Sequence, residues 1–342
     1  MKSDQIVPTS ATSDAPLVDP FGRVHTSVRL SVTDRCNIRC FYCMPETDAQ
    51  FVPRDRLLSF EELYRLSELL VRRGGISDIR ITGGEPLVRR QLDRLIEMLG
   101  TIDGLEDLSL TTNGILLADQ AESLRRAGLK RINVSLDTLD EGVFRQITRR
   151  EGLDKTIAGI DAAIAAGFDS VKLNALAIRG ITEKEVVRLV NFALERDVVL
   201  RFIEFMPLDS DRAWHKESVL SGNVLLSIIR EHFGEVSDLP RANPSQPAED
   251  FSVRGGRVGI IRSVSEPFCA SCNRLRITAD GSIRNCLFAQ TETPIRELMR
   301  GGATDAELLD QIRGCVMAKA AAHGINQDGF VAPDRPMYAI GG

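Results

Sequence analysis

The stretch "DRCNIRCFYC" (residues 34–43) holds three cysteines in the spacing C-x3-C-x2-C, and no fourth cysteine follows it closely. It comes directly after "SVRLSV" (27–32), a short run that predicts a strand. Thiolates bind zinc or iron–sulfur clusters, and structural zinc sites normally take four ligands. A [4Fe–4S] cluster on three cysteines keeps one iron open, so the missing ligand favours chemistry at a cluster. A zinc knuckle or a chance spacing is the alternative.

A second set of three cysteines lies in "CASCNRLRITADGSIRNC" (269–286), with the spacing C-x2-C-x13-C. Two incomplete triplets in one chain favour a second cluster with an open iron over a zinc ribbon that lacks a visible ligand. The seventh cysteine, Cys315, occupies an apolar-face position of a helical pattern, and we expect it in the core. Without an export signal, metal ligation is expected rather than disulfides.

Strands alternate with amphipathic helical patterns between residues 21 and 236, which predicts βαβ units and a parallel sheet. The pattern leaves an open doubly wound sheet and an incomplete barrel equally possible, and both bind ligands at the carboxyl ends of strands. The expected strands are 27–32, 78–83, 107–114, 131–137, 170–178 and 199–206, and the expected helices include 58–74, 89–100, 155–167 and 183–197.

The pattern changes in residues 237–342, where we expect a β-rich appendage that carries the second cysteine set. Residues 237–250 are rich in Pro and Ser and predict a loop. Two hairpins are expected, one turning at Gly255–Gly256 and one at Asp280–Gly281. Helical patterns return at 293–301 and 304–322, and the chain ends in Gly-Gly.

Composition restricts the class of partner. The chain has 342 residues, a net charge of −5 and a pI of about 5.6, which argues against binding to duplex nucleic acid. No apolar run approaches the roughly 18 residues of a membrane span. Residues 1–20 lack the apolar segment of a secretory signal, so we expect a cytoplasmic protein with a disordered N-terminal tail.

Cations occupy positions inside the expected strands, where a parallel sheet is normally apolar. Two more lie two residues apart after Cys272, so their side chains share one face of a strand. A solvated face is the usual explanation of such pairs. Because a buried unpaired cation costs several kcal/mol, these side chains need an anionic partner, and arginine forks suit a polyphosphate. The residues are Arg29, Arg80, Lys172, Arg201, Arg274 and Arg276.

The first cysteine motif, with Tyr42 before its last cysteine, resembles that of the radical S-adenosylmethionine (SAM) superfamily, and "ITGGEP" (81–86) resembles that superfamily's glycine-rich motif. This resemblance implies an α/β fold: an incomplete β/α (TIM-like) barrel, here with a β-rich C-terminal iron–sulfur cluster domain. It also implies that the open iron chelates SAM, whose reductive cleavage releases a 5′-deoxyadenosyl radical. From the residues themselves, Gly83 and Gly84 are expected to let backbone approach a ligand closely.

From about Gly22 to Gly342 the chain is similar to the GTP 3′,8-cyclase family of molybdenum cofactor biosynthesis. The shared motifs are "VRLSVTDRCN", "CFYCMP", "IRITGGEPL", "LTTNG", "RINVSLDTLD", "RFIEFMP", "FCASCNRLRITADG" and the terminal "GG". One departure is Asp78, where some relatives carry a lysine. The resemblance implies conversion of GTP to 3′,8-cyclo-7,8-dihydro-GTP, beginning with abstraction of the ribose 3′ hydrogen.

The resemblance assigns roles residue by residue. The metal ligands are Cys36, Cys40 and Cys43 for the SAM-cleaving cluster and Cys269, Cys272 and Cys286 for a second [4Fe–4S] cluster that takes the guanine. Residues of the SAM pocket are Tyr42, Gly84, Ser135 and Met206. Contacts to GTP are expected from Arg29, Arg80, Thr111, Lys172, Arg274, Leu275 and Arg276, with Arg201 as a further candidate. Arg274 and Arg276 are the expected catalytic residues, and the Gly-Gly tail is expected beside them.

The family also implies an electron-donor protein, a homodimer, and transfer of the product to cyclic pyranopterin monophosphate synthase. A peptide-modifying radical SAM maturase with an auxiliary cluster is the main rival, and a non-catalytic iron–sulfur or zinc protein is another. A polypeptide substrate gives no reason for cations at Arg29, Arg80 and Lys172, and a non-catalytic protein predicts fully ligated metals.

Overall fold

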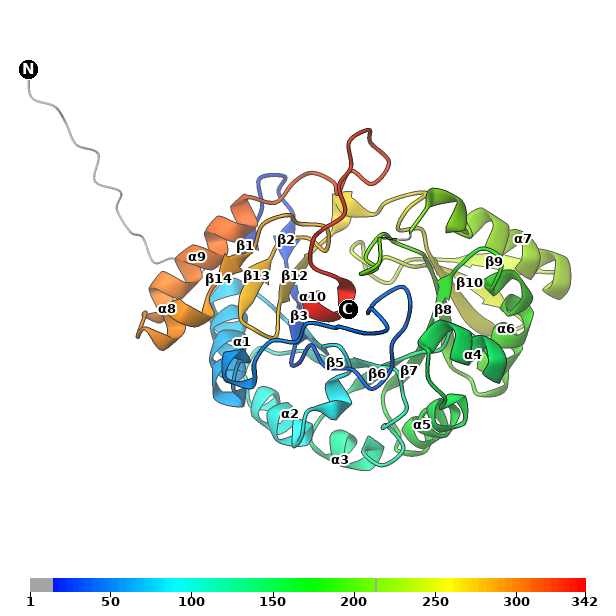
Figure 1. Ribbon diagram of the computed structural model, residues 1–342, viewed down its shortest axis with the longest axis horizontal. Helices are drawn as coiled ribbons and strands as arrows, with labels where there is room; N and C mark the ends of the chain where they lie inside the picture. The colour runs from blue at the N-terminus through cyan, green and yellow to red at the C-terminus, as the bar shows by residue number, and fades with distance from the viewer. Residues whose placement is uncertain (1–14, 213) are drawn as a thin grey trace, which may run out of the picture.

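The computed structural model describes residues 15–212 and 214–342. Its centre is a parallel sheet that curves into a half-open barrel (Figure 1). Six strands follow one another in chain order across this sheet, each parallel to the next. They are β3 (Ser27–Ser31), β4 (Asp78–Thr82), β5 (Asp107–Thr112), β6 (Arg131–Ser135), β7 (Ser170–Ala177) and β8 (Val199–Glu204). All six predicted strands are confirmed, and the incomplete barrel is the correct alternative.

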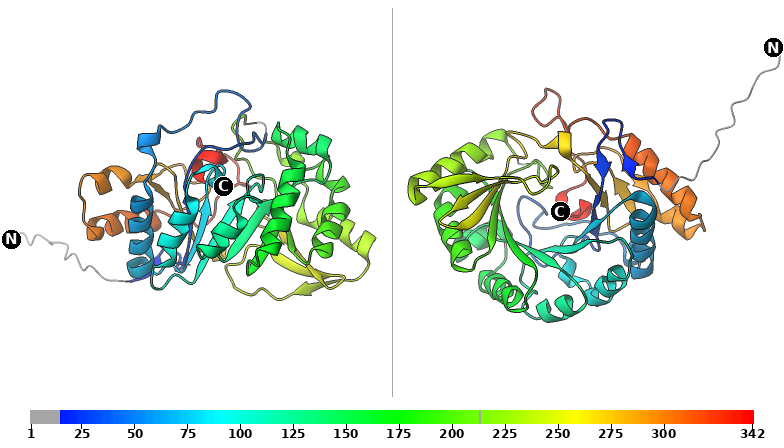
Figure 2. Two further views of the ribbon diagram at one scale, coloured as in Figure 1. Left: turned by 90° about the horizontal axis from the view of Figure 1, so that it is seen from below. Right: turned by 180° about the vertical axis from the view of Figure 1, so that it is seen from behind.

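Helices cover the outside of the barrel (Figures 1 and 2). They are α1 (Phe60–Gly74), α2 (Leu92–Gly100), α3 (Ala121–Arg126), α4 (Glu141–Thr148), α5 (Leu153–Ala165), α6 (Val186–Glu195) and α7 (Gly222–Phe233). The first begins where Ser59 and Glu62 form a reciprocal capping box, as the predicted N-cap requires. Short 3-10 turns lie at Arg54–Arg56, Pro86–Val88, Thr182–Lys184, Lys216–Ser218 and Cys269–Ser271. The turn Thr182–Lys184 takes the start of the predicted helix 183–197, and α2 starts only after Gln91, which has φ +58°.

The C-terminal strands do not form a separate appendage. Strand β11 (Gly256–Ile261) pairs parallel with β8, and β12 (Arg274–Ile277) pairs parallel with β3, so this region extends both edges of the barrel sheet. The outer strands are β9 (Val236–Leu239) and β10 (Glu249–Val253) on one side, and β13 (Ser282–Arg284) and β14 (Thr293–Pro294) on the other. Among the described residues no pairing joins β9 to β14, so the barrel stays open. The division at residues 236/237 remains a prediction.

Both predicted hairpins are present, and one turn is displaced. Strands β10 and β11 are joined at Arg254–Gly255, one residue earlier than expected, because Val253 pairs with Gly256. Both turn residues have positive φ, 48° and 85°, as a type I′ turn requires. The predicted helix at 293–301 is shorter, α8 (Arg296–Arg300), since β14 takes its start. The next is α9 (Asp305–Met317), which buries Cys315 in the core as predicted.

The described part of the N-terminal segment, which starts at residue 15, contains a short hairpin. Residues 1–14 of the predicted disordered tail lie outside the described part, but Leu17–Val18 form β1 and pair with β2 (Val24–His25). Leu17 is 1 % exposed, and its Cδ1 lies 3.3 Å from the position that a Cβ on Gly74 would take. The predicted tail is therefore too long, because Leu17 is a core residue.

Apolar and polar side chains alternate along the barrel strands. Residues such as Val28, Leu30, Ile79 and Ile81 are buried in the main hydrophobic core, as the outward positions of strands covered by helices. The residues between them on the same two strands are polar: Arg29 and Ser31 on β3, and Arg80 and Thr82 on β4. The sheet is thus apolar outward and polar inward.

The C-terminal segment returns to the barrel mouth, where it ends in the short helix α10 (Met337–Ile340) and Gly341–Gly342 (Figures 1 and 2). Ile340 and Tyr338 are buried there. The helices in the described part of the chain all fall short of the length and apolarity that a membrane crossing requires.

Candidate active site

The first cysteine set lies on a loop that follows β3 at the carboxyl end of the sheet. Cys40 begins a tight turn in which its carbonyl accepts from the backbone of Cys43 and Met44, both at 2.9 Å. Backbone bonds from Arg39 to Thr148 and from Phe41 to Ile147 attach the loop to α4. The side chain of Asn113 donates to Asn37 at 2.7 Å and to Cys36 Sγ at 3.8 Å. The loop is therefore fixed from two sides.

The glycine-rich loop after β4 packs directly against the cysteine loop. Gly84 and Glu85 donate backbone hydrogen bonds to the carbonyls of Thr33 and Arg35, at 2.7 and 2.8 Å. A Cβ on Gly84 would lie 2.5 Å from the Arg35 carbonyl oxygen, and one on Gly83 would lie 2.7 Å from that of Thr33. The close approach that these glycines allow is thus to the cysteine loop's own backbone, and the expected approach to a ligand stays a prediction.

One cavity of about 230 Å³ opens at the barrel mouth. Its lining includes all three cysteines of the first set and all four residues predicted for the SAM pocket, Tyr42, Gly84, Ser135 and Met206. Thr111 and the C-terminal Gly342 also line it. Segments more than 290 residues apart thus meet at one cavity, as the motif assignments require. The roles of these residues in binding stay predictions.

Buried acids that the sequence reading missed belong to the same cavity. Tyr42 Oη donates to Asp137 Oδ2 at 2.7 Å, and the other Asp137 oxygen accepts from the backbone of Leu176. Burial raises the pKa of both Tyr42 and Asp137. Burial also raises the pKa of Glu85 to about 7, although Thr112 and two backbone amides donate to it. Asp137 lies two residues after the end of β6, and its place at a strand's carboxyl end was the available signal.

Three of the predicted cations lie side by side on adjacent strands of the barrel. Arg276, Arg29 and Arg80 stand at directly paired positions of β12, β3 and β4. Burial and then the neighbouring arginines lower the pKa of Arg29, and burial lowers that of Arg80 to about 10 despite Asp78. Lys172 has a pKa lowered to about 7 by burial and by the charges of Arg201 and Arg131. The lumen therefore holds a surplus of positive charge.

The β12 arginines connect this charge to the second cysteine set. Arg274 donates to the Ser245 carbonyl at 3.0 Å and lies over the Phe268 ring. Arg276 donates to the Gly341 carbonyl at 2.5 Å. Leu275, between them, is 1 % exposed and packs in the hydrophobic core. Any contact of Leu275 with a substrate would therefore involve its backbone, and that contact stays a prediction.

Two further basic residues hold the second cysteine set, and neither was predicted. Lys319 Nζ donates to the Arg274 carbonyl at 3.0 Å and to Cys272 Sγ at 3.8 Å. Arg23 donates to the Cys269 carbonyl at 2.8 Å and is paired with Asp19. Burial would raise the pKa of Cys272, but Lys319 and Arg274 outweigh it and lower the pKa. No local pattern marks a lone lysine or arginine as such a contact.

Both cysteine sets fit iron–sulfur clusters. Among the described residues, no three or more His, Cys, Asp or Glu side chains converge on one ion. The thiolates of a cubane bind different irons, so their sulfur atoms surround a cluster and need not converge. Burial and Glu85 raise the pKa of Cys36 to about 11, and burial raises those of Cys40 and Cys43. Without a metal these side chains are therefore neutral thiols, and binding of a cluster would release their protons.

An open β/α barrel with a three-cysteine loop beyond its first long parallel strand is the arrangement of the radical SAM superfamily, whose family model matches residues 30–193. A second model, Molybdenum Cofactor Synthesis C, matches residues 198–325. Two solved structures share the fold. Native anSMEcpe with bound AdoMet has a TM-score of 0.57 at 15% identity, covering 92% of this chain and 93% of its own. Streptococcus suis SuiB bound to S-adenosylmethionine has a TM-score of 0.55 at 14% identity, covering 93% and 76%.

Curated relatives narrow the class. The GTP 3′,8-cyclase of Rhodopirellula baltica is 62% identical over 98% of this chain and 94% of its own length. That of Mycolicibacterium smegmatis is 46% identical over 97% and 93%. The chain belongs to the GTP 3′,8-cyclase family.

Proposed function

We propose that this chain is a radical SAM GTP 3′,8-cyclase, which converts GTP to 3′,8-cyclo-7,8-dihydro-GTP in molybdenum cofactor biosynthesis. The observation that carries the proposal is the row Arg276–Arg29–Arg80 across three adjacent strands of the lumen. Three guanidiniums side by side favour a polyanion between the two cysteine sets. A peptide-modifying maturase, the rival function, would have no use for this row.

The residues expected to bind cofactors fall into two sites. The cluster that binds SAM would be held by Cys36, Cys40 and Cys43. The cluster that binds guanine would be held by Cys269, Cys272 and Cys286. When bound, the first cluster and SAM supply an electron and a 5′-deoxyadenosyl radical. Tyr42, Gly84, Ser135 and Met206 form walls that would orient SAM and exclude water from it.

The chain's basic residues would bind and orient GTP. Arg29, Arg80 and Lys172 would hold the phosphates, and Arg274 and Arg276 would join them from β12, next to the second cysteine set. Thr111 lines the cavity on the side of the first set and would contact the nucleoside. This arrangement would hold the ribose between the two cofactor sites.

Four further proposals rest on the family alone: a cytoplasmic location, a homodimer, an electron-donor protein, and transfer of the product to cyclic pyranopterin monophosphate synthase. The deciding experiment is an anaerobic assay of the reconstituted protein with GTP, SAM and a strong reductant. We expect one cyclised product per 5′-deoxyadenosine. SAM cleavage that GTP does not stimulate, with no cyclised nucleotide, would contradict the proposed function.

A further inference from the structure

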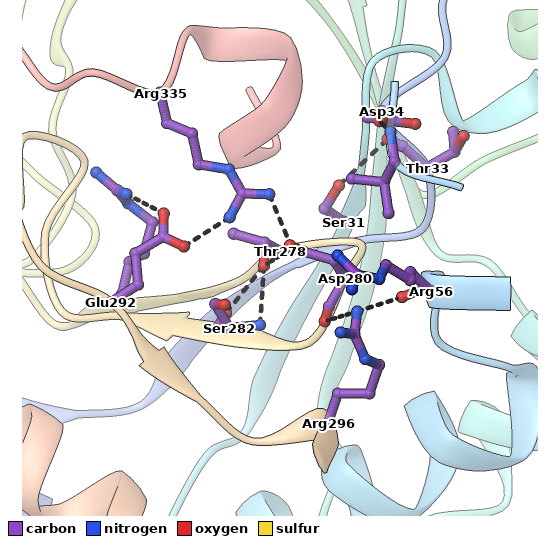
Figure 3. A network of polar contacts seen from close by, with 12 residues as sticks. Ser31, Thr33, Asp34, Arg56, Thr278, Asp280, Ser282, Glu292, Arg296 and Arg335 are labelled. Carbon is purple, nitrogen blue, oxygen red and sulfur yellow. Dashed lines mark hydrogen bonds and ion pairs between the residues drawn. The ribbon is translucent and has the colours of Figure 1, made fainter. Parts of the chain in front are cut away.

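The segment that leads to the C-terminus is anchored to the β12–β13 hairpin by the guanidinium of Arg335. Arg335, two residues before α10, donates Nη1 to Glu292 at 2.6 Å and Nη2 to Asp280 at 2.8 Å. Figure 3 shows Arg335 reaching from this segment to both carboxylates. About a quarter of each of the three side chains is exposed. Such a two-pronged, partly buried contact is stronger than an ordinary surface ion pair.

Both carboxylates are themselves fixed to the edge of the sheet. Glu292 also pairs with Arg284, which is 2 % exposed and donates to the Ala289 carbonyl as well. Asp280 accepts from Thr278 Oγ1 at 2.6 Å, within the turn that joins β12 to β13 (Figure 3). Because β12 carries Arg274 and Arg276, Arg335 ties the C-terminal segment to the same hairpin that supplies the lumen arginines.

A second tie lies six residues further on. The Gly341 carbonyl accepts from Arg276 at 2.5 Å, and Gly342 lines the cavity. Gly341 has φ +87°, and a Cβ there would lie 2.7 Å from the Ser31 Cβ, so glycine alone fits. Residues 336–340 are all that separate the two ties. With Tyr338 and Ile340 buried, this short segment has little slack to absorb a shift at Arg335.

We propose that Arg335 is a positioning residue that fixes Gly341–Gly342 in the barrel mouth, and that it thereby sets the orientation in which Arg276 meets the triphosphate. The first part stands on the geometry alone, and the second rests on the proposed function. The competing explanation is that Arg335 acts directly, by stiffening the β12–β13 hairpin through Asp280.

Accessibility of the C-terminus tests the first part. Full-length Arg335→Ala and wild-type proteins are treated with a carboxypeptidase, and the release of Gly342 is followed by mass spectrometry. Loss of both charge-assisted bonds should speed release about ten- to a hundredfold, because digestion requires local opening. Arg335→Lys should fall between the two. Equal rates for Arg335→Ala and wild type would overturn the proposal.

Arg212→Ala is the matched control. Arg212 pairs at 2.8 Å with Asp334, the residue next to Arg335, but both side chains are well exposed, at 68% and 90%. This surface pair should contribute little, so release should match wild type. Equal acceleration by both substitutions would mean that any change of charge near the tail loosens it, and would also overturn the proposal.

A double-mutant cycle tests the second part. In the full chain, Arg335→Ala should weaken GTP binding about tenfold. In a chain lacking Gly341 and Gly342, the same substitution should have no further effect, because the tail through which it acts is gone. Equal losses in both backgrounds would show direct action through the hairpin. If wild type binds no GTP, the proposed function fails, whereas the release experiment still decides the first part.

Discussion

Arg29 and Arg80 stand side by side, at paired positions of the adjacent parallel strands β3 and β4, and Arg276 pairs with Arg29 on its other side. Like charges at directly neighbouring positions of a sheet destabilise it. The Asp78 carboxylate raises the pKa of both Arg29 and Arg80. The pKa of each arginine nevertheless stays below its usual value. In the ligand-free protein, repulsion between these arginines therefore destabilises the fold, and a bound polyanion would offset that repulsion.

Replacing Arg29 by Met should consequently have opposite effects on stability and binding. The free energy of unfolding without nucleotide should rise by about 1–4 kcal/mol, as when buried charges give way to apolar groups. The affinity for GTP should fall about ten- to a hundredfold, since one charge-assisted contact is lost. Thermal melting with and without GTP measures both.

Arg125→Met is the control for this experiment. Arg125 is an exposed arginine paired with Asp169 outside the lumen, so its loss should lower stability slightly and leave GTP affinity unchanged. If Arg29→Met destabilises the nucleotide-free protein instead, Arg29 serves the fold and the repulsion argument is wrong.

Lys172 should make GTP binding depend on pH. Its pKa is lowered to about 7 in the nucleotide-free protein, and a bound polyanion favours the charged form. Binding above pH 7 must therefore take up a proton, so affinity should fall as pH rises from 7, by at most tenfold per unit. Stability without nucleotide should change the other way and rise from pH 7 to about 10.5, because the unfolded chain keeps the proton over that range.

Lys172→Arg isolates this effect, since arginine stays charged throughout. Titration calorimetry in buffers of different ionisation enthalpy counts the protons taken up. The terminal phosphate of GTP titrates alike in both proteins, so the difference between them belongs to residue 172. Identical proton uptake by wild type and Lys172→Arg would show that Lys172 does not meet the phosphates.

Tyr42→Phe should weaken the wall of the cavity beside the first cysteine set. The substitution removes the hydroxyl that donates to Asp137 at 2.7 Å and leaves a buried carboxylate oxygen without that donor. A cost of about 1–3 kcal/mol in unfolding free energy is expected, together with weaker SAM binding. In the Asp137→Asn background the further loss should be smaller, because the carboxylate charge is already gone. Additive losses would mean that the two side chains act independently.

Much of this could be predicted from local sequence. The period-two and helical alternations marked the six barrel strands and α1 because side chains on strands and helices bury with those periods. The cysteine sets and strand cations stood out because their spacing is chemically unusual. Lys319, Arg23, Asp137 and Arg335 escaped notice because each is a lone polar residue, and its meaning depends on a partner elsewhere in the chain.

The strand pairings at the edges of the barrel sheet could not be predicted from the sequence for the same reason. Nothing in Arg274–Ile277 says that it will lie beside Ser27–Ser31, about 250 residues away, and so complete the arginine row. The ordered β1–β2 hairpin also depends on distant packing, that of Leu17 near Gly74. Two residues in each strand are too few to show a period.

Arg274 and Arg276 give the sharpest test of substrate class. Arg276→Ala removes a guanidinium that stands next to Arg29 and is influenced by Cys272 and Cys286. GTP affinity should fall about ten- to a hundredfold, and Arg274→Ala should behave alike. Guanosine affinity should change far less, because the lost contacts are to phosphate. The iron content of both arginine variants should stay at about eight per chain, as two four-iron clusters require. Cys272→Ala should lower the iron content, whereas Cys315→Ala should leave it unchanged. Equal losses for guanosine and GTP would assign both arginines to the cluster or the fold, and the polyphosphate reading of the lumen would lose its support.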